Sequence, residues 1–183
     1  MSATGHTVLV GVTGSIAAYK AADIVSQLVK RGCNVHVILT QSAAQFVTPL
    51  TFLTLSKNPV VTTSFSAETD WKPVHIDLAD RASLLLIAPA TANIIAELAH
   101  GSASHPLTEI ALATRAPLLI APAMNGKMWE HAATQHNVAL LRSRGAEFIG
   151  PDSGMLACGY EGAGRMSEPS AIVERASALL ASR

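Results

Sequence analysis

The chain has 183 residues, of which 49% are hydrophobic and 14% charged, and its formal net charge at pH 7 is zero. This length suits one domain with a substantial core and leaves little room for a second one. A neutral chain with 4% aromatic residues lacks the basic and stacking surfaces that bind nucleic acids, and the positive charge that attracts anionic membranes. Because a domain surface in water usually carries about 25–35% charged residues, so few charges suggest that other subunits cover part of it.

The N-terminal residues show no signal-peptide pattern, and no run of about 18 apolar residues that could cross a membrane is present. The two cysteines, Cys33 and Cys158, are far apart in the sequence, which fits neither a disulfide framework nor a zinc site. We therefore expect a protein of the reducing cytoplasm, in which Cys158 stays a free thiol.

Short apolar runs alternate with helical patterns along the chain. The runs are typical of buried strands and cover Thr7–Val12, Asn34–Leu39, Ser83–Ala88, Pro117–Ala121 and the shorter Glu147–Ile149. The predicted helices cover Ser15–Arg31, Ala90–Ala99, Thr134–Arg144 and Glu168–Ser182. Such alternation predicts one α/β domain over residues 1–183, built on a doubly wound parallel sheet of the Rossmann or flavodoxin-like type.

Two segments break this alternation. Lys57–Val74 contains prolines, threonines and Trp71 without clean periodicity, so an irregular connection is expected there. Gly150–Met166 contains five glycines and little pattern. A long glycine-rich loop inside a compact domain is often a functional lid, and a disordered turn is the alternative that its composition leaves equally open.

The connection after the first strand could bind an anion. Ligands of open α/β sheets lie at the carboxyl ends of the strands, which is where Gly11–Ile16 (GVTGSI) is expected. Gly14 permits a close backbone approach, Ser15 can cap the following helix, and the first helical N–H groups can receive a phosphate. Neither a dinucleotide fingerprint nor a P-loop is present, so a plain helix cap explains this stretch equally well.

Small polar residues also follow the next two strands. Thr40 and Ser42 come after the second strand, and Thr91 and Asn93 come after the third. Each could cap a helix, but parallel strands share one carboxyl edge, so a common ligand explains the set better than unrelated caps. No acidic residue is placed to hold a ribose diol, which disfavours a dinucleotide and favours a mononucleotide such as FMN.

Three residues could carry chemistry, and each also has an ordinary structural explanation. Asn125, in a Pro-Ala-Met-Asn turn, could bind a carboxylate or only cap a helix. His75 could be a base or an electrostatic partner if it lies in a cleft, and in a strand Asp77 would share its face. Cys158 could be an acid, a nucleophile or an idle thiol, whereas Cys33 borders a strand and is expected to pack in the core.

Six motifs span essentially the whole chain. They are GSIAAYK (Gly14–Lys20), TQSA (Thr40–Ala43), HIDLA (His75–Ala79), APATAN (Ala88–Asn93), PAMNGKMW (Pro122–Trp129) and ACGYEGAGRM (Ala157–Met166). In these motifs and their order, the chain resembles the flavin-dependent cysteine decarboxylases, most closely the phosphopantothenoylcysteine decarboxylases of coenzyme A synthesis. The Pro-x-Met-Asn-x-x-Met-Trp signature, with a matching His before it and a Cys after it, is specific to this family.

The resemblance implies FMN bound between the subunits of a trimer, which often assembles into a dodecamer. It implies oxidation of the cysteine moiety of 4'-phospho-N-pantothenoylcysteine to a thioaldehyde, loss of carbon dioxide to give an enethiolate, and reduction to 4'-phosphopantetheine. On this analogy Asn125 grips the substrate carboxylate, His75 supports decarboxylation, and Cys158 donates the final proton from a closing lid. The substrate would also contact Met155, Leu156 and Ala157, and the residues holding FMN would be Gly14, Ser15, Ile16, Thr40, Ser42, Thr91, Ala92, Asn93 and Ala123.

The chain departs from the family after Gly101, where relatives carry a pair of Asp or Asn residues followed by leucine. Here the sequence is Ser104-His105-Pro106-Leu107, so contacts to FMN or between subunits could differ, while Pro106 could start a helix. Many relatives continue into a ligase domain that makes the substrate. The chain is therefore expected to be a stand-alone decarboxylase or one domain of a longer protein, with the ligase separate or fused.

Two other functions remain open from the sequence. One is a decarboxylase of peptide C-terminal cysteines, as in lantibiotic maturation, and ACGYEGAGRM argues against it because only the coenzyme A reaction needs the final acid. The other is a non-catalytic flavin-binding regulatory subunit, but such relatives have lost a catalytic residue or carry an acidic tail. Flavin prenyltransferases share the fold and lack the PAMNGKMW element.

Overall fold

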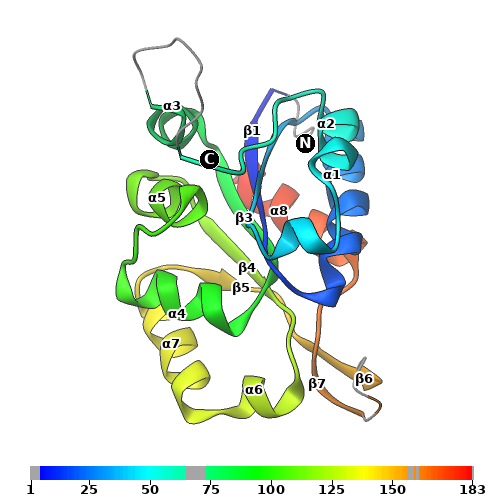
Figure 1. Cartoon of the computed structure of the whole chain (residues 1–183), viewed down its shortest axis with the longest axis vertical. Coiled ribbons are helices and arrows are strands. Elements are labelled where there is room, and N and C mark those ends of the chain that lie inside the picture. Colours follow the sequence, from blue (N-terminus) through cyan, green and yellow to red (C-terminus); the bar gives the residue numbers. More distant parts are fainter. Residues whose placement is uncertain (1–4, 65–72, 156–158, 160, 183) are drawn as a thin grey trace.

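A computed structural model describes residues 5–64, 73–155, 159 and 161–182. At its centre lies a five-stranded sheet of order β2-β1-β3-β4-β5 in which every neighbouring pair is parallel (Figure 1). Its strands are β1 (Thr7–Val12), β2 (Asn34–Leu39), β3 (Leu84–Ala90), β4 (Leu118–Pro122) and β5 (Glu147–Phe148). This is the flavodoxin-like strand order, and it confirms the predicted doubly wound parallel sheet.

Helices cover both faces of the sheet (Figure 1). One face carries η1 (Ile16–Tyr19), α1 (Lys20–Lys30), α2 (Pro49–Ser56) and α8 (Pro169–Ala181). The other face carries α3 (Val74–Arg81), α4 (Ala92–His100), α5 (Pro106–Ala113) and α7 (Ala132–Ser143). The short segments η2 (Ala43–Gln45) and α6 (Gly126–Glu130) lie in the connections after β2 and β4. Among the described residues, no helix combines the length and apolarity needed to cross a membrane.

The apolar strands contribute side chains to two hydrophobic cores, one on each face of the sheet. In β1, Val8, Val10 and Val12 belong to the core under α1 and α8, whereas Leu9 belongs to the core under α4 and α5. All four side chains are fully buried. This explains why the strand sequences are continuously apolar rather than alternating with polar residues. Cys33 is 6% exposed in the first of these cores, as predicted, and its burial raises the pKa of the thiol.

Two predicted helices begin later than the sequence suggested. Ala90 pairs with Pro122 in the sheet, and Thr91 caps α4 by accepting the Ile94 N–H, so this helix starts at Ala92. In the first connection a 3-10 turn precedes α1, because Ser15 holds an extended conformation and its hydroxyl accepts the Ala17 N–H. The predicted stop at Gly101 is confirmed by its left-handed backbone, with φ of 68°.

The strand considered for His75 and Asp77 is wrong, because both lie in helix α3. Pro73 immediately precedes this helix, and Val74 and Leu78, four residues apart, turn toward the same core. Residues two apart on a helix point in nearly opposite directions. Asp77 accordingly pairs with Arg81 at 2.5 Å and does not share the face of His75.

Of the two segments without pattern, the first is an irregular connection as expected where the structure describes it, and the second differs from expectation. In the first segment, Val61 makes an isolated parallel bridge to Ile38 at the edge of the sheet, and residues 65–72 lie outside the described part. The glycine-rich segment contains an antiparallel hairpin of β6 (Asp152–Met155) and β7 (Glu161–Arg165) rather than an irregular loop or a disordered turn. Leu156, Ala157 and Cys158 lie outside the described residues.

Acidification is expected to destabilise the fold through His36. This β2 side chain is 8% exposed, and burial, reinforced by the Arg81 charge, lowers its pKa below the ordinary value of 6.5. The unfolded chain therefore binds the proton more readily, and the free energy of unfolding falls as the pH drops below about 6.5. Urea titrations at several pH values should show a steeper fall for the wild type than for His36→Gln. Equal slopes would contradict the expectation.

Candidate functional site

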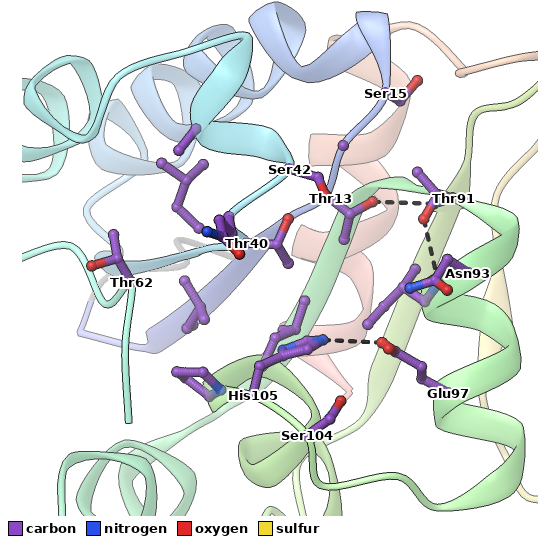
Figure 2. A pocket seen from close by; sticks show the side chains of 18 of the residues that line it. Thr13, Ser15, Thr40, Ser42, Thr62, Thr91, Asn93, Glu97, Ser104 and His105 are labelled. Atoms are coloured by element: carbon purple, nitrogen blue, oxygen red, sulfur yellow. Dashed lines mark hydrogen bonds and ion pairs between the residues drawn. The ribbon is translucent and has the colours of Figure 1, made fainter. Parts of the chain in front are cut away.

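A cavity of ≈ 1100 Å³ opens at the carboxyl ends of β1 to β4 (Figure 2). It is lined by the polar residues that follow three of these strands, which confirms that they converge on one place. Of the nine residues assigned to FMN from the resemblance, only Ile16 is absent from its wall, and the others are Gly14, Ser15, Thr40, Ser42, Thr91, Ala92, Asn93 and Ala123. Their roles as cofactor contacts remain predictions.

Thr13, which the sequence did not single out, holds strand ends together at the carboxyl edge of the sheet. Its hydroxyl donates to the Pro89 carbonyl oxygen at 2.7 Å and accepts the Thr91 N–H at 3.1 Å. The side chain is 2% exposed, so both bonds are sheltered from water. This one hydroxyl therefore ties the end of β1 to the end of β3 and the start of α4 (Figure 2).

Gly14 is needed because two connections touch at this point. A Cβ atom on Gly14 would lie 2.5 Å from the Ser42 Cβ, which is far inside the contact distance of two non-bonded carbon atoms. The loop after β1 and the loop after β2 therefore meet only because residue 14 has no side chain. This contact brings Ser15 and Ser42, two of the residues predicted to hold FMN, to the same wall of the cavity.

An acidic residue that the sequence did not single out lies at this edge. Glu97 of α4 lines the cavity, and its Oε2 lies 3.0 Å from Nε2 of His105 (Figure 2). The sequence contains a signal for it, since Asn93 and Glu97 are four residues apart and share one face of the helix. Ser104 and His105, where the chain departs from the family, also line the cavity, and Pro106 starts α5 as expected.

A second cavity of ≈ 410 Å³ adjoins the first and shares Ser15, Ala123 and Met124 with it. It contains Asn125 and Met155, two of the residues predicted to contact substrate. Asn125 caps α6, because its Oδ1 accepts the Lys127 N–H at 2.9 Å. Oδ1 of an amide only accepts hydrogen bonds, so Nδ2 is the atom of Asn125 that could donate to an anion.

The β6–β7 hairpin is docked on the turn that carries Asn125. The Met124 N–H donates to the Gly164 carbonyl oxygen at 2.9 Å, and a Cβ on Gly164 would lie 2.3 Å from the Met124 oxygen. Only glycine permits this approach. The glycine-rich segment is therefore held against the candidate substrate site at its base.

Two cations line the second cavity, Lys20 of α1 and Arg165 of β7. Both pair with Glu168, Lys20 at 3.4 Å and Arg165 through a hydrogen bond. The hydrogen bond from Arg165, followed by the charge of Lys20, lowers the pKa of Glu168. With two positive charges and one negative charge in this group, the cavity suits an anionic ligand.

His75 lines neither of these two cavities. It faces α5, where its Nδ1 lies 3.5 Å from Oε2 of Glu109. The fold of one chain thus brings the predicted FMN residues together and places Asn125 beside them, but it leaves His75 apart from both groups.

Removing the Thr13 hydroxyl is expected to lower the stability of the protein and its retention of flavin. In Thr13→Val the Pro89 oxygen and the Thr91 N–H lose their partner, which costs about 2–6 kcal/mol for two unsatisfied groups. We expect this loss of unfolding free energy in urea and a weaker retention of flavin in equilibrium dialysis. Thr54→Val, which removes an exposed hydroxyl bond to the Leu50 carbonyl, is the control and should change neither quantity.

The flavoprotein family profile matches residues 1–181. The coenzyme A biosynthesis bifunctional protein CoaBC of Bacillus subtilis is 50% identical over 171 residues, which are 93% of this chain and 42% of that protein. The chain thus spans about two fifths of CoaBC. The probable phosphopantothenoylcysteine decarboxylase of Streptococcus mutans is 46% identical over 170 residues, with 92% of this chain and 95% of that protein covered.

Solved structures show the same architecture. A PPC decarboxylase mutant complexed with pantothenoylaminoethenethiol aligns with a TM-score of 0.86 and 30% identity, covering 94% of this chain and 97% of that one. The FMN-binding protein AtHal3 aligns with a TM-score of 0.85 and 31% identity, covering 97% of this chain and 98% of that one.

Proposed function

The chain belongs to the flavoprotein family, and from this premise we propose that it is an FMN-dependent phosphopantothenoylcysteine decarboxylase of coenzyme A biosynthesis. Its substrate would be 4'-phospho-N-pantothenoylcysteine and its product 4'-phosphopantetheine. The observation that carries this proposal is the pair of adjoining cavities, one walled by hydroxyl and amide groups and the other by Asn125 and two cations. The Streptococcus mutans relative supports the same activity, since it is matched over nearly its full length.

The first cavity suits FMN in size and in chemistry. Its ≈ 1100 Å³ exceeds what a mononucleotide needs. Its hydroxyl and backbone donors at Ser15, Ser42 and Thr91 can satisfy a phosphate and a ribityl chain, and the loop at Gly14 leaves the backbone accessible. When bound there, FMN supplies the two-electron oxidation and reduction of the cysteine moiety that the reaction requires.

Asn125 would hold the carboxylate that leaves as carbon dioxide. Its amide donates a hydrogen bond without adding a positive charge, so it fixes the carboxylate without stabilising this charged ground state as strongly as an arginine would. Lys20 and Arg165 line the same cavity and would attract the anionic substrate. A peptide with a C-terminal cysteine lacks the phosphate, so these two cations favour the phosphorylated substrate over the peptide one.

His75 and Cys158 complete the proposed chemistry. Cys158, which follows the cavity residue Met155 by three positions, would donate the final proton, with the hairpin segment acting as a lid over the substrate. Because His75 lines neither cavity of its own chain, we propose that it serves a site formed with a second copy.

A homo-oligomer, a trimer or a dodecamer built from trimers, fits the surface of the chain. Several large apolar side chains are exposed, at Ile16, Tyr19, Phe46, Leu50, Leu53, Leu112, Met128 and Met155. Ile16, Tyr19 and Met155 border the second cavity, so a neighbouring subunit covering them would also shield the substrate from water. The ligase that makes the substrate would be a fused domain, as in CoaBC, or a separate protein.

The test uses the purified protein, its flavin spectrum and one substrate. Incubation with 4'-phospho-N-pantothenoylcysteine should yield 4'-phosphopantetheine, identified by mass, and Cys158→Ser should stop at an oxidised enethiol product. A yellow protein inert to this substrate but active on a peptide C-terminal cysteine would replace the proposed substrate. A protein that binds flavin and decarboxylates neither would have a regulatory role, and one that cannot bind FMN would overturn the proposal.

A further inference from the structure

Two ionisable side chains face each other between α3 and α5, outside both cavities. Nδ1 of His75 lies 3.5 Å from Oε2 of Glu109. Both atoms are buried, and neither has a hydrogen-bond partner among the residues that the structure describes. Leaving a buried donor and a buried acceptor unpaired costs about 1–3 kcal/mol each, so a small rotation that joins them is strongly favoured.

The contacts of Glu109 and the exposure of His75 show how the two side chains are oriented. Oε1 of Glu109 already accepts the Ser64 hydroxyl at 2.9 Å, so Oε2 is the oxygen turned toward the imidazole. The His75 side chain is 27% exposed although its Nδ1 is buried, so the reachable part of the side chain lies elsewhere. The ring therefore has a buried edge that meets a carboxylate and an outer edge that can meet another molecule.

We propose that Glu109 is a positioning residue for His75, accepting its Nδ1–H bond and so leaving the proton off Nε2. This inference rests on the proposed catalytic role of His75. A carboxylate behind an imidazole fixes the ring orientation and its tautomer, and it stabilises the cation that forms when the outer nitrogen takes a proton. With the proton held on Nδ1, the Nε2 lone pair accepts a proton from bound substrate, and the resulting positive charge is paired with Glu109.

Ser64 links this pair to the cofactor cavity. Its hydroxyl orients Glu109, and the same residue lines the first cavity. The series Ser64–Glu109–His75, a hydrogen bond followed by a 3.5 Å contact, thus runs from the cavity wall to the imidazole. The series depends on three segments that are distant in sequence, since Ser64 precedes α3 by ten residues and Glu109 lies in α5.

The experiment reads the tautomer of His75 by ¹⁵N NMR in protein labelled at histidine, with the resonance assigned by its loss in His75→Gln. At a pH about two units above the ordinary imidazole value of about 6.5, the wild type should show the Nδ1–H form. Glu109→Met removes the acceptor at similar length and should convert most of the signal to the Nε2–H form. Glu174→Gln, which alters an exposed carboxylate on α8, should leave the signal unchanged.

Turnover supplies a second readout. Glu109→Met should lower kcat at least about 10-fold with little change in KM, since an ill-oriented base loses part of a contribution of about 10²–10⁴, while Glu174→Gln should keep full activity. If Glu109→Met does not fold, Glu109→Gln is used in its place, and in that variant His75 should show a mixture of the two tautomers. The proposal is overturned if His75 carries its proton on Nε2 in the wild type, or if the Glu109 variants leave its tautomer unchanged. Because the spectrum needs no substrate, a protein that passes this test yet decarboxylates nothing would refute only the proposed function.

Discussion

Replacing Asn125 by aspartate is expected to lower kcat/KM for 4'-phospho-N-pantothenoylcysteine by about 10³-fold or more while α6 remains capped. Aspartate keeps an oxygen for the Lys127 N–H, which Asn125 accepts at 2.9 Å, and it is as good an N-cap as asparagine. It removes the amide donors, however, and sets a negative charge where the substrate carboxylate would lie. Steady-state kinetics, with flavin content and the unfolding midpoint measured on the same sample, checks this result.

Two further substitutions at this position separate the charge from the cap. Asn125→Ser keeps a capping oxygen and adds no charge, so its activity should fall by about 10–100-fold, the equivalent of one lost hydrogen bond to a charged group. Asn125→Ala should be as inactive as the serine variant and less stable by about 1 kcal/mol because the cap is gone. If aspartate retained more activity than serine, Asn125 would not bind a carboxylate, and its role would be confined to the cap.

The strands are the part of the fold that the sequence predicts best. Thr7–Val12 and Asn34–Leu39 match β1 and β2 residue for residue, because helices cover both faces of the sheet and demand an unbroken apolar run. Helix α2 lacks such a signal. Its Phe52 is fully buried while Leu50 is 67% exposed, so apolar residues occupy its outer side as well and the helical period disappears.

Some residues of the site can likewise be predicted from the local sequence, whereas others come together only through tertiary packing. Thr40 and Thr91 reach the first cavity because each directly follows a strand, and that position can be read from the sequence. The pairing of Glu97 with His105 cannot be predicted from the sequence, because it depends on how α4 and α5 pack against each other. His75 is the clearest case, since HIDLA predicts neither the helix it occupies nor the carboxylate of Glu109 that faces it.

Gly164→Ala is expected to detach the hairpin from the turn that carries Asn125. A Cβ atom there would lie 2.3 Å from the Met124 carbonyl oxygen, and residue 164 has a φ of 147°, which side chains rarely adopt. The backbone oxygen cannot rotate away as a side chain could. Overpacking against it, with the strained φ, should cost about 2–4 kcal/mol, unless the hairpin moves and gives up the Met124 N–H bond to Gly164.

Activity distinguishes these two responses. If the hairpin moves, Met155 and Arg165 leave the second cavity, and the segment bearing Cys158 is no longer anchored, so turnover should fall by about 10²-fold or more even where stability changes little. Hydrogen exchange at the Met124 amide reports the detachment directly. Gly145→Ala is the matched control, because Gly145 has a φ of 92° with nothing within 4 Å of its Cβ position, and it should cost only about 1–2 kcal/mol. A Gly164→Ala protein with full turnover and a protected Met124 amide would show that the hairpin does not need to dock on the Asn125 turn for catalysis.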